Sequence, residues 1–308
     1  MKILVSGAGG MVGTRFVQYA RTLGCEVLAL SRSASGPGLV RWDPASGTID
    51  PSTLEGCDAV LHLAGENIAS GRWTKERKRL IIESRVRGTG LLCHALASLK
   101  SPPGVLVCAS GSNYYADNAG GPPWDETGPT GDGFLSEVCR RWEGAADPAR
   151  QVGIRVVHAR MGAVLSTRGG LLPKLLPAIC SGLGGTAGSG RQRMSWIHVD
   201  DLAAAFMLAM EEVSLSGPVN VCAPLPVSNR DFTKALASAV HRPCFVTMPS
   251  AAIRWLFGEM GEALLLADNA VIPARLAGAG MKWEHGELAG AIEDLLAHCG
   301  CKGLHSGL

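Results

Sequence analysis

A glycine-rich loop near the start of the chain constrains the fold more than any other feature. The apolar run at residues 3–6 predicts a buried strand, and the periodic apolar segment at residues 11–23 predicts a helix. Glycines between a strand and a helix permit a tight turn and close packing, and they let backbone amides approach a pyrophosphate. The positive end of the helix favours the same anion. The sequence therefore predicts a dinucleotide site, formed by Gly7, Gly10, Met11, Val12 and Gly13.

Short apolar runs alternate with helical segments through the first half of the chain. Continuous apolar runs, rather than alternating ones, indicate strands that are buried on both faces. The longest helical segment, residues 74–99, carries an apolar stripe and ends before two prolines. Strands are expected at residues 3–6, 26–31, 59–64, 105–110, 155–160 and 219–222. The pattern predicts an α/β fold with a Rossmann-type doubly wound parallel sheet.

The composition changes after residue 165, where glycine-rich loops replace the strand and helix alternation. Helices dominate from residue 229 onward, with one further strand expected at residues 244–248. We therefore expect a smaller C-terminal α/β cap domain. The predicted division assigns residues 1–165 and 195–230 to the nucleotide-binding domain, and residues 166–194 and 231–308 to the smaller substrate or cap domain.

The charge balance and the cysteines exclude several classes of protein. The net charge is only +2, from 29 Lys and Arg against 27 Asp and Glu, so neither nucleic acid nor an anionic membrane is an expected partner. No apolar run reaches the ~18 residues of a membrane span, and the start of the chain lacks a cleavable signal. Among ten cysteines only Cys299 and Cys301 are closely spaced, whereas zinc needs about four ligands. We expect a reduced, cytoplasmic protein without a metal.

The end of the second predicted strand indicates which dinucleotide binds. An NAD site places Asp or Glu about 20 residues after the glycines, where the carboxylate binds the ribose hydroxyls. Here the strand ends in Ser31 and Arg32, with no carboxylate. A carboxylate would repel the 2′-phosphate of NADP, whereas a hydroxyl and a guanidinium bind it. NADP is therefore the expected cofactor; the alternative is that Arg32 is a solvated loop residue.

Several segments resemble the extended short-chain dehydrogenase/reductase superfamily. Beside the glycine loop, these are residues 58–65 (D-A-V-L-H-L-A-G), 85–92 (R-V-R-G-T-G-L-L) and 196–203 (W-I-H-V-D-D-L-A). Arg85 stands where the superfamily carries Asn. The resemblance covers nearly the whole chain. It implies further cofactor contacts at Leu63, Ala64, Gly65, Arg160 and Met161.

Within this superfamily the chain is most similar to an atypical, epimerase-like branch. Its members are named nucleoside-diphosphate-sugar epimerase or cell-division-inhibitor-like protein. The resemblance implies a Rossmann domain with bound NADP, a small C-terminal domain, a small-molecule substrate and a possible homodimer. It rests on residues 63–68, the Arg72-Trp73 pair, the Tyr114-Tyr115 pair, and residues 134–143, 182–185 and 249–276.

The catalytic pair of the superfamily is missing from this sequence. Relatives use Ser or Thr with a Y-x-x-x-K motif, in which Lys lowers the pKa of the Tyr acid/base from its free value of ~10. Alignment on Glu143 puts Leu135 in the place of Tyr and Cys139 in the place of Lys. The remaining catalytic candidates are Ser110, which matches the catalytic Ser/Thr, and Tyr114. The alternative is that Tyr114 and the tyrosine after it only pack the loop.

Arg85 shares the apolar stripe of the long helix, and this stripe should face the sheet near the cofactor phosphates. We therefore count Arg85 among the cofactor-binding residues and expect it to replace the missing Lys electrostatically. The alternative is an arginine whose charged end reaches solvent at the edge of the stripe.

Two functions are compatible with this sequence. The first is an NADP(H)-binding oxidoreductase or epimerase-like enzyme of unknown substrate, in which the cofactor carries the hydride. The second is a non-catalytic NADP(H)-binding regulatory or redox-sensing protein. The missing Tyr and Lys favour the second function, whereas Ser110 and Tyr114 favour the first, which is the one we expect.

Overall fold

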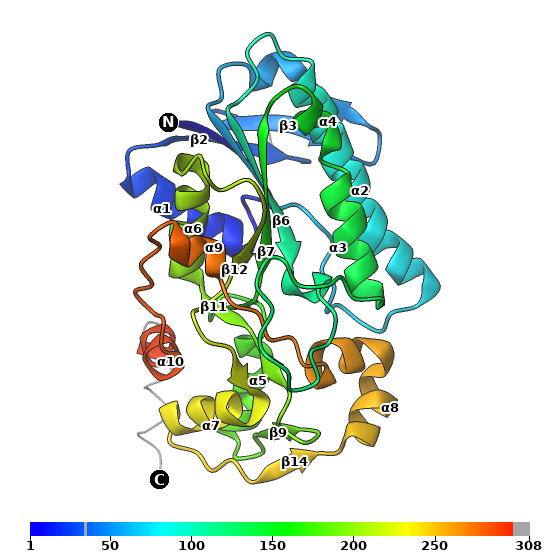
Figure 1. Cartoon of the computed structure of the whole chain (residues 1–308), viewed down its shortest axis with the longest axis vertical. Helices are drawn as coiled ribbons and strands as arrows, with labels where there is room; N and C mark the ends of the chain where they lie inside the picture. Colours follow the sequence, from blue (N-terminus) through cyan, green and yellow to red (C-terminus); the bar gives the residue numbers. More distant parts are fainter. Residues whose placement is uncertain (34–35, 298–308) are drawn as a thin grey trace.

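An eight-stranded sheet forms the centre of the protein (Figure 1). The computed structural model describes residues 1–33 and 36–297. All neighbouring strands of the sheet are parallel except β3 and β4. This confirms the expected Rossmann-type α/β fold. In spatial order the strands are β12 (Gly217–Val221), β7 (Arg155–Met161), β6 (Val105–Gly111), β5 (Ala59–His62), β1 (Lys2–Ser6), β2 (Glu26–Ser31), β3 (Leu39–Asp43) and β4 (Thr48–Ile49).

Helices cover both faces of the sheet (Figure 1). One face carries α1 (Met11–Thr22) and α6 (Val199–Glu211), where the rings of Phe16 and Phe206 meet edge to face at 6.0 Å. The other face carries α2 (Lys75–Ala97), α3 (Phe134–Gly144) and α4 (Asp147–Gln151), and Leu92 of α2 packs there in one buried cluster with Leu106 of β6. Burial of both faces explains the continuous apolar runs of the central strands.

Residues 163–297 add smaller elements, most of which lie in the lower half of Figure 1. A third buried cluster, which includes Leu172, Trp196, Phe232 and Ile292, packs several of them together. The predicted division into two domains stays a prediction, and its last residues, 298–308, lie outside the described part of the chain. The elements are β8 (Ala163–Leu165), α5 (Leu172–Cys180), β9 (Gly185–Ala187), β10 (Arg193–Met194), β11 (Trp196–His198), β13 (Val227–Ser228), α7 (Asn229–Ala239), β14 (Val246–Met248), α8 (Ser250–Gly261), η3 (Glu262–Leu266), α9 (Ala274–Gly278) and α10 (Leu288–Ala297), and the short helices η1 (Pro51–Leu54) and η2 (Ser112–Tyr114) belong to the first half.

The sequence prediction did not include β3 and β4. Along β3 buried residues alternate with more exposed ones, because this strand lies near the edge of the sheet. Its alternation lacks the continuous apolar signal of the central strands. Only residues 32–38 connect β2 to β3, which leaves no room for the helix that usually joins parallel strands. The face of β2 and β3 beside α1 is therefore open.

No helix in the described ranges is long and apolar enough to cross a membrane. The cysteines of residues 1–33 and 36–297 are all free thiols. The closely spaced pair Cys299 and Cys301 lies outside the described residues.

Candidate functional site

The glycine loop meets the segment after β5 at the carboxyl ends of the parallel strands. Because β2 and β5 lie on opposite sides of β1, the strand order reverses here, and such a point is where doubly wound sheets bind nucleotides. Gly7 has φ +72°, and an added Cβ would lie only 3.1 Å from the backbone N of Ala64 and from the carbonyl carbon of Leu63. The structure thus brings together two sets of predicted cofactor residues that are far apart in sequence.

The start of α1 fits a phosphate group. A Cβ added at Gly13 would lie 2.2 Å from the carbonyl oxygen of Gly7, so helix and loop touch through backbone alone. Gly10 is the N-cap of α1; no side chain caps the helix, and its first turn carries no acidic residue. The amide groups of Met11 and Val12 lie in this first turn, where no carbonyl of the helix and no capping side chain accepts their hydrogen bonds. They are therefore available to a phosphate.

A buried histidine fixes the segment after β5. His62 is fully buried, and its Nδ1 lies 2.6 Å from Ser6 Oγ, which accepts the backbone N–H groups of Leu63 and Ala64. Ser6 therefore donates its own proton to His62 Nδ1, and Nε2 donates to Thr89 Oγ1 at 2.9 Å. Burial, aided by the charge of Arg85, lowers the His62 pKa to about 4, so the ring is neutral at pH 7. This role of His62 was not expected from the sequence, although a histidine inside an apolar strand is its signal.

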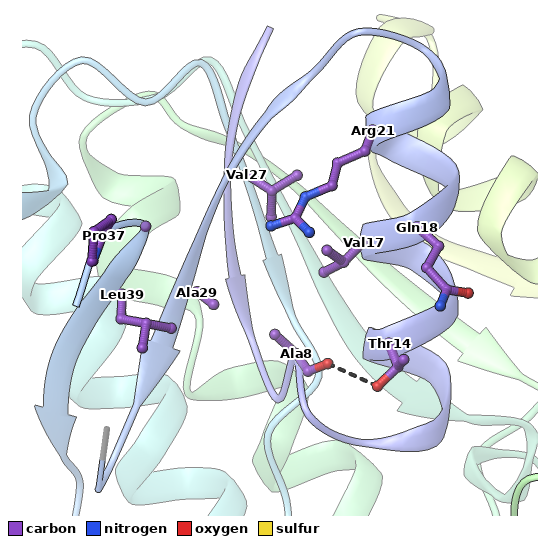
Figure 2. Close-up of a pocket in the computed structure, with 10 residues that line it drawn as sticks. Ala8, Thr14, Val17, Gln18, Arg21, Val27, Ala29, Pro37 and Leu39 are labelled. Atoms are coloured by element: carbon purple, nitrogen blue, oxygen red, sulfur yellow. Dashed lines mark hydrogen bonds between the residues drawn. The ribbon is translucent and has the colours of Figure 1, made fainter. Parts of the chain in front are cut away.

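A groove of about 260 Å³ runs from the glycine loop along α1 to β2 and β3 (Figure 2). Ala8 and Thr14 line it near the loop, and Figure 2 shows Arg21 extending toward Val27 farther along. Ser31 ends β2 and pairs with Arg41 of β3, and the exposed Arg32 follows it. The predicted 2′-phosphate residues thus lie at the carboxyl end of the strand that borders this groove.

Arg160, Glu143 and Ser110 form a buried network at the ends of β6 and β7. Arg160 donates from Nε and Nη2 to the two carboxylate oxygens of Glu143, both at 2.9 Å, and Ser110 Oγ donates to the same carboxylate at 2.7 Å. The side chains of Arg160 and Glu143 are only 4% and 12% exposed. The guanidinium of Arg160 is therefore already bound by groups of the protein itself. The predicted cofactor contact is left to the backbone of Arg160 and of Met161, which pairs with Gly111.

The two adjacent tyrosines differ in their surroundings. Tyr115 is 5% exposed; its hydroxyl donates to Asn220 Oδ1 at 2.7 Å and accepts from Arg160 Nη1 at 2.9 Å. Burial raises the Tyr115 pKa to about 12, which makes it a poor acid or base. Tyr114 is half-buried, and Arg160 Cζ lies 3.4 Å from the centre of its ring. Tyr114 is thus the better catalytic candidate of the two.

Leu135 and Cys139, which the sequence aligns with the Tyr and Lys of the superfamily, are both buried, and Arg85 is partly buried. Leu135 and Cys139 are 6% and 5% exposed, and burial raises the Cys139 pKa to about 11, so its side chain is a neutral thiol. Arg85 lies against Gly65, with its Cζ 4.8 Å from the Trp142 ring. It donates to the carbonyl oxygen of Glu66 at 2.9 Å and forms no ion pair with a described carboxylate. Burial lowers its pKa to about 10.

Three potential metal ligands lie together outside this site. Side-chain ligand atoms of His198, His285 and Asp294 lie within 4.8 Å of one another. However, His198 Nδ1 accepts the backbone N–H of Asp200 at 3.1 Å as the N-cap of α6. The proton of neutral His198 is then on Nε2, the nitrogen that lies 3.4 Å from Asp294 Oδ2. The geometry therefore favours helix capping over metal ligation.

Comparisons with known proteins agree with this geometry. The family described as "NAD dependent epimerase/dehydratase family" matches residues 3–222, and a "Domain of unknown function (DUF1731)" matches residues 248–295. Epimerase family protein MT2273 of Mycobacterium tuberculosis is 39% identical over 291 residues, which cover 94% of this chain and 96% of the relative. The human epimerase family protein SDR39U1 is 36% identical, covering 96% and 100%.

Solved structures support the same assignment. The crystal structure of human SDR39U1 (isoform 2) with NADPH matches with a TM-score of 0.87 and 34% identity, over 96% of this chain and 99% of that one. A nucleoside-diphosphate sugar epimerase from Corynebacterium glutamicum matches with a TM-score of 0.80 and 32% identity, over 97% of this chain and 58% of that one. The chain therefore belongs to the NAD dependent epimerase/dehydratase family and has the short-chain dehydrogenase/reductase type of fold that its sequence resembles.

Proposed function

We propose that the protein is an NADP(H)-dependent oxidoreductase that acts on a small carbonyl compound or alcohol. The observation that carries the proposal is the uncapped start of α1, which packs through Gly13 against the backbone of Gly7 and Ala8, while Gly7 lies against the segment after β5. The human relative solved with NADPH supports the choice of cofactor. The two-domain division, a cytoplasmic location and a homodimer are parts of the same proposal.

The choice of NADP over NAD rests on Ser31 and Arg32. A guanidinium next to the ribose binds the dianionic 2′-phosphate, which NADH lacks. Arg32→Ala should weaken NADPH binding about 10- to 100-fold and leave NADH binding unchanged, as one charge-assisted contact is worth ~1.5–3 kcal/mol. Calorimetric titration measures both affinities. Arg242→Ala, which removes another exposed arginine, is the control and should bind both cofactors like the wild type. If Arg32→Ala weakened NADPH and NADH binding equally, Arg32 would not be the residue that binds the 2′-phosphate.

The bound cofactor would supply the hydride, and the chain would supply the proton and the orientation of the substrate. Tyr114 donates its phenolic proton to the substrate oxygen during reduction and regains a proton from solvent, since it is only half-buried. Arg160 lies over the Tyr114 ring and stabilises the negative charge that the phenol acquires. Arg85, next to Cys139, supplies the second positive charge in the place of the missing Lys.

Replacement of Tyr114 tests this chemistry. Tyr114→Phe removes the proton donor and should lower kcat at least about 100-fold for a carbonyl that the wild type reduces, with the NADPH dissociation constant unchanged. NADPH oxidation at pH 7 measures the rate across a panel of aldehydes and ketones. Tyr19→Phe, which changes the remaining tyrosine on α1, should reduce the panel like the wild type. Full activity of Tyr114→Phe would contradict the role of Tyr114.

A non-catalytic NADP(H)-binding function is the second candidate, favoured by one observation. Leu135 and Cys139, which the sequence aligns with the Tyr and Lys of the superfamily motif, are buried and uncharged. A regulatory protein would bind NADPH and gain thermal stability from it, but would oxidise it with no member of the carbonyl panel.

A further inference from the structure

A second pocket, of about 480 Å³, is lined by residues between 73 and 136 on one side and by residues between 254 and 269 on the other. Asn113 and Tyr115 line it on one side and flank Tyr114, and Leu135 at the start of α3 lines it next to them. The opposite wall comes from α8 and η3, and Figure 1 shows α8 beneath the ends of α2 and α3. The pocket thus reaches the segment that carries the proposed proton donor, although Tyr114 itself does not line it. Its volume suits a small organic molecule.

An aromatic pair forms part of this pocket. The rings of Trp73 and Phe134 meet edge to face, with their centroids 4.9 Å apart. Trp73 Nε1 donates to the carbonyl oxygen of Ile68 at 2.8 Å, which fixes the indole. These rings offer an apolar surface to a ligand, and Lys78 Nζ already lies 4.9 Å from the centre of the Phe134 ring.

The charged residues of the lining are mostly acidic. Arg254 is the only basic residue of the pocket lining within the described chain, whereas several carboxylates line it. The acidic residues are Asp117, Asp132, Glu259, Glu262 and Asp268.

Three of the lining carboxylates already have a basic partner, which is Arg254 of the lining itself or a residue outside it. Arg254 lies 3.2 Å from Glu262, Arg193 binds Asp268 at 3.0 Å, and Lys78 forms an ion pair with Glu259. The acidic residues left over are Asp117, which accepts the backbone N–H groups of Ala119 and Asp268, and the exposed Asp132, neither of which pairs with a described cation. The pocket therefore keeps an excess of negative charge.

We propose that this pocket receives the substrate of the oxidoreductase, and that the substrate carries no phosphate or carboxylate group and is uncharged or positively charged. The inference rests on the proposed function and narrows its substrate class. A diphosphate needs guanidinium or ammonium groups that are not already neutralised, and here it would meet unpaired carboxylates instead. The proposal therefore excludes nucleoside-diphosphate sugars, although one matched protein is a nucleoside-diphosphate sugar epimerase.

Three methyl ketones of the same shape and different charge test the proposal. They are para-acetylbenzoate, para-acetylbenzamide and para-acetylbenzylammonium, titrated by NMR saturation transfer into the NADPH-loaded full-length protein at pH 7. The ammonium and amide compounds should each bind at least about 10-fold more tightly than the carboxylate, and UDP-glucose should show no binding at about 1 mM. Tighter binding of the carboxylate or of UDP-glucose would overturn the proposal.

Substitutions at Asp132 test whether the preference for the ammonium ketone over the carboxylate ketone arises in this pocket. Asp132→Lys should reverse the order of the ammonium and carboxylate compounds, and Asp132→Asn should lower the ratio of their affinities about threefold. Glu293→Gln, which neutralises an exposed acid of α10 outside the pocket, should leave the ratio unchanged. An unchanged ratio in Asp132→Lys, or binding of none of the ketones while NADPH still binds, would overturn the pocket assignment and leave the cofactor function standing. If the wild-type protein did not bind NADPH, the proposed function itself would be refuted.

Discussion

Replacing Gly13 by alanine is expected to abolish useful NADPH binding. The new methyl group would lie 2.2 Å from the carbonyl oxygen of Gly7 and 2.7 Å from Cα of Ala8, and neither is a flexible side chain that could move away. The loop must shift, so the amides at the start of α1 no longer point at a common pyrophosphate. We expect the dissociation constant for NADPH to rise at least about 100-fold, or ~2.7 kcal/mol, in a calorimetric titration.

A matched glycine on another helix separates this clash from a general effect of alanine. Gly90 lies in α2, and an added Cβ there has no atom within 4 Å. Because alanine is the better helix former by up to ~1 kcal/mol, Gly90→Ala should be slightly stabilised and should bind NADPH like the wild type. Gly13→Ala should instead lose ~1–3 kcal/mol of stability through overpacking. Wild-type NADPH affinity in Gly13→Ala would contradict the placement of the pyrophosphate.

The second large effect is expected on stability, at Glu143. Glu143→Leu leaves the guanidinium of Arg160, whose side chain is 4% exposed, without its carboxylate. A buried charge that loses its partner costs about 3–5 kcal/mol, so urea unfolding at pH 7 should show a loss of that size. The variant should also lower any carbonyl-reducing activity, because Arg160 contacts the ring of Tyr114.

A double substitution shows whether the stability loss in Glu143→Leu comes from the unpaired buried charge of Arg160 or from lost packing. Glu143→Leu with Arg160→Met removes both charges and should recover most of the lost stability, since apolar residues often replace a buried ion pair at little cost. Glu137→Leu breaks the exposed contacts of Glu137 with Arg140 and Arg141 and should change stability by no more than about 1 kcal/mol. A double variant as unstable as Glu143→Leu alone would mean that packing, not charge, dominates at this network.

The central strands and the glycine loop could be predicted because their signals are local. The expected strand at residues 26–31 coincides with β2, Glu26–Ser31, and the expected helix at residues 11–23 differs from α1 by one residue. Because these strands are buried on both faces, their residues are apolar at consecutive positions, and the sequence alone shows this. By contrast, β3 is exposed on alternate residues and was not predicted.

Much of the candidate site depends on partners that are distant in sequence. Ser110 and Glu143 are 33 positions apart, and Tyr115 and Asn220 are 105 apart, so no local pattern pairs them. Their positions follow from the strand order, in which β7 lies between β6 and β12. The sequence identified Ser110 as a candidate, but only the structure shows that its hydroxyl is bound to a carboxylate.

NADP(H) should bind where β1 turns into α1. A calorimetric titration of the purified wild-type protein with NADPH, repeated with NADH, measures this binding. We expect one NADPH per chain, bound at least about 10-fold more tightly than NADH. No heat from either nucleotide, or tighter binding of NADH, would contradict it.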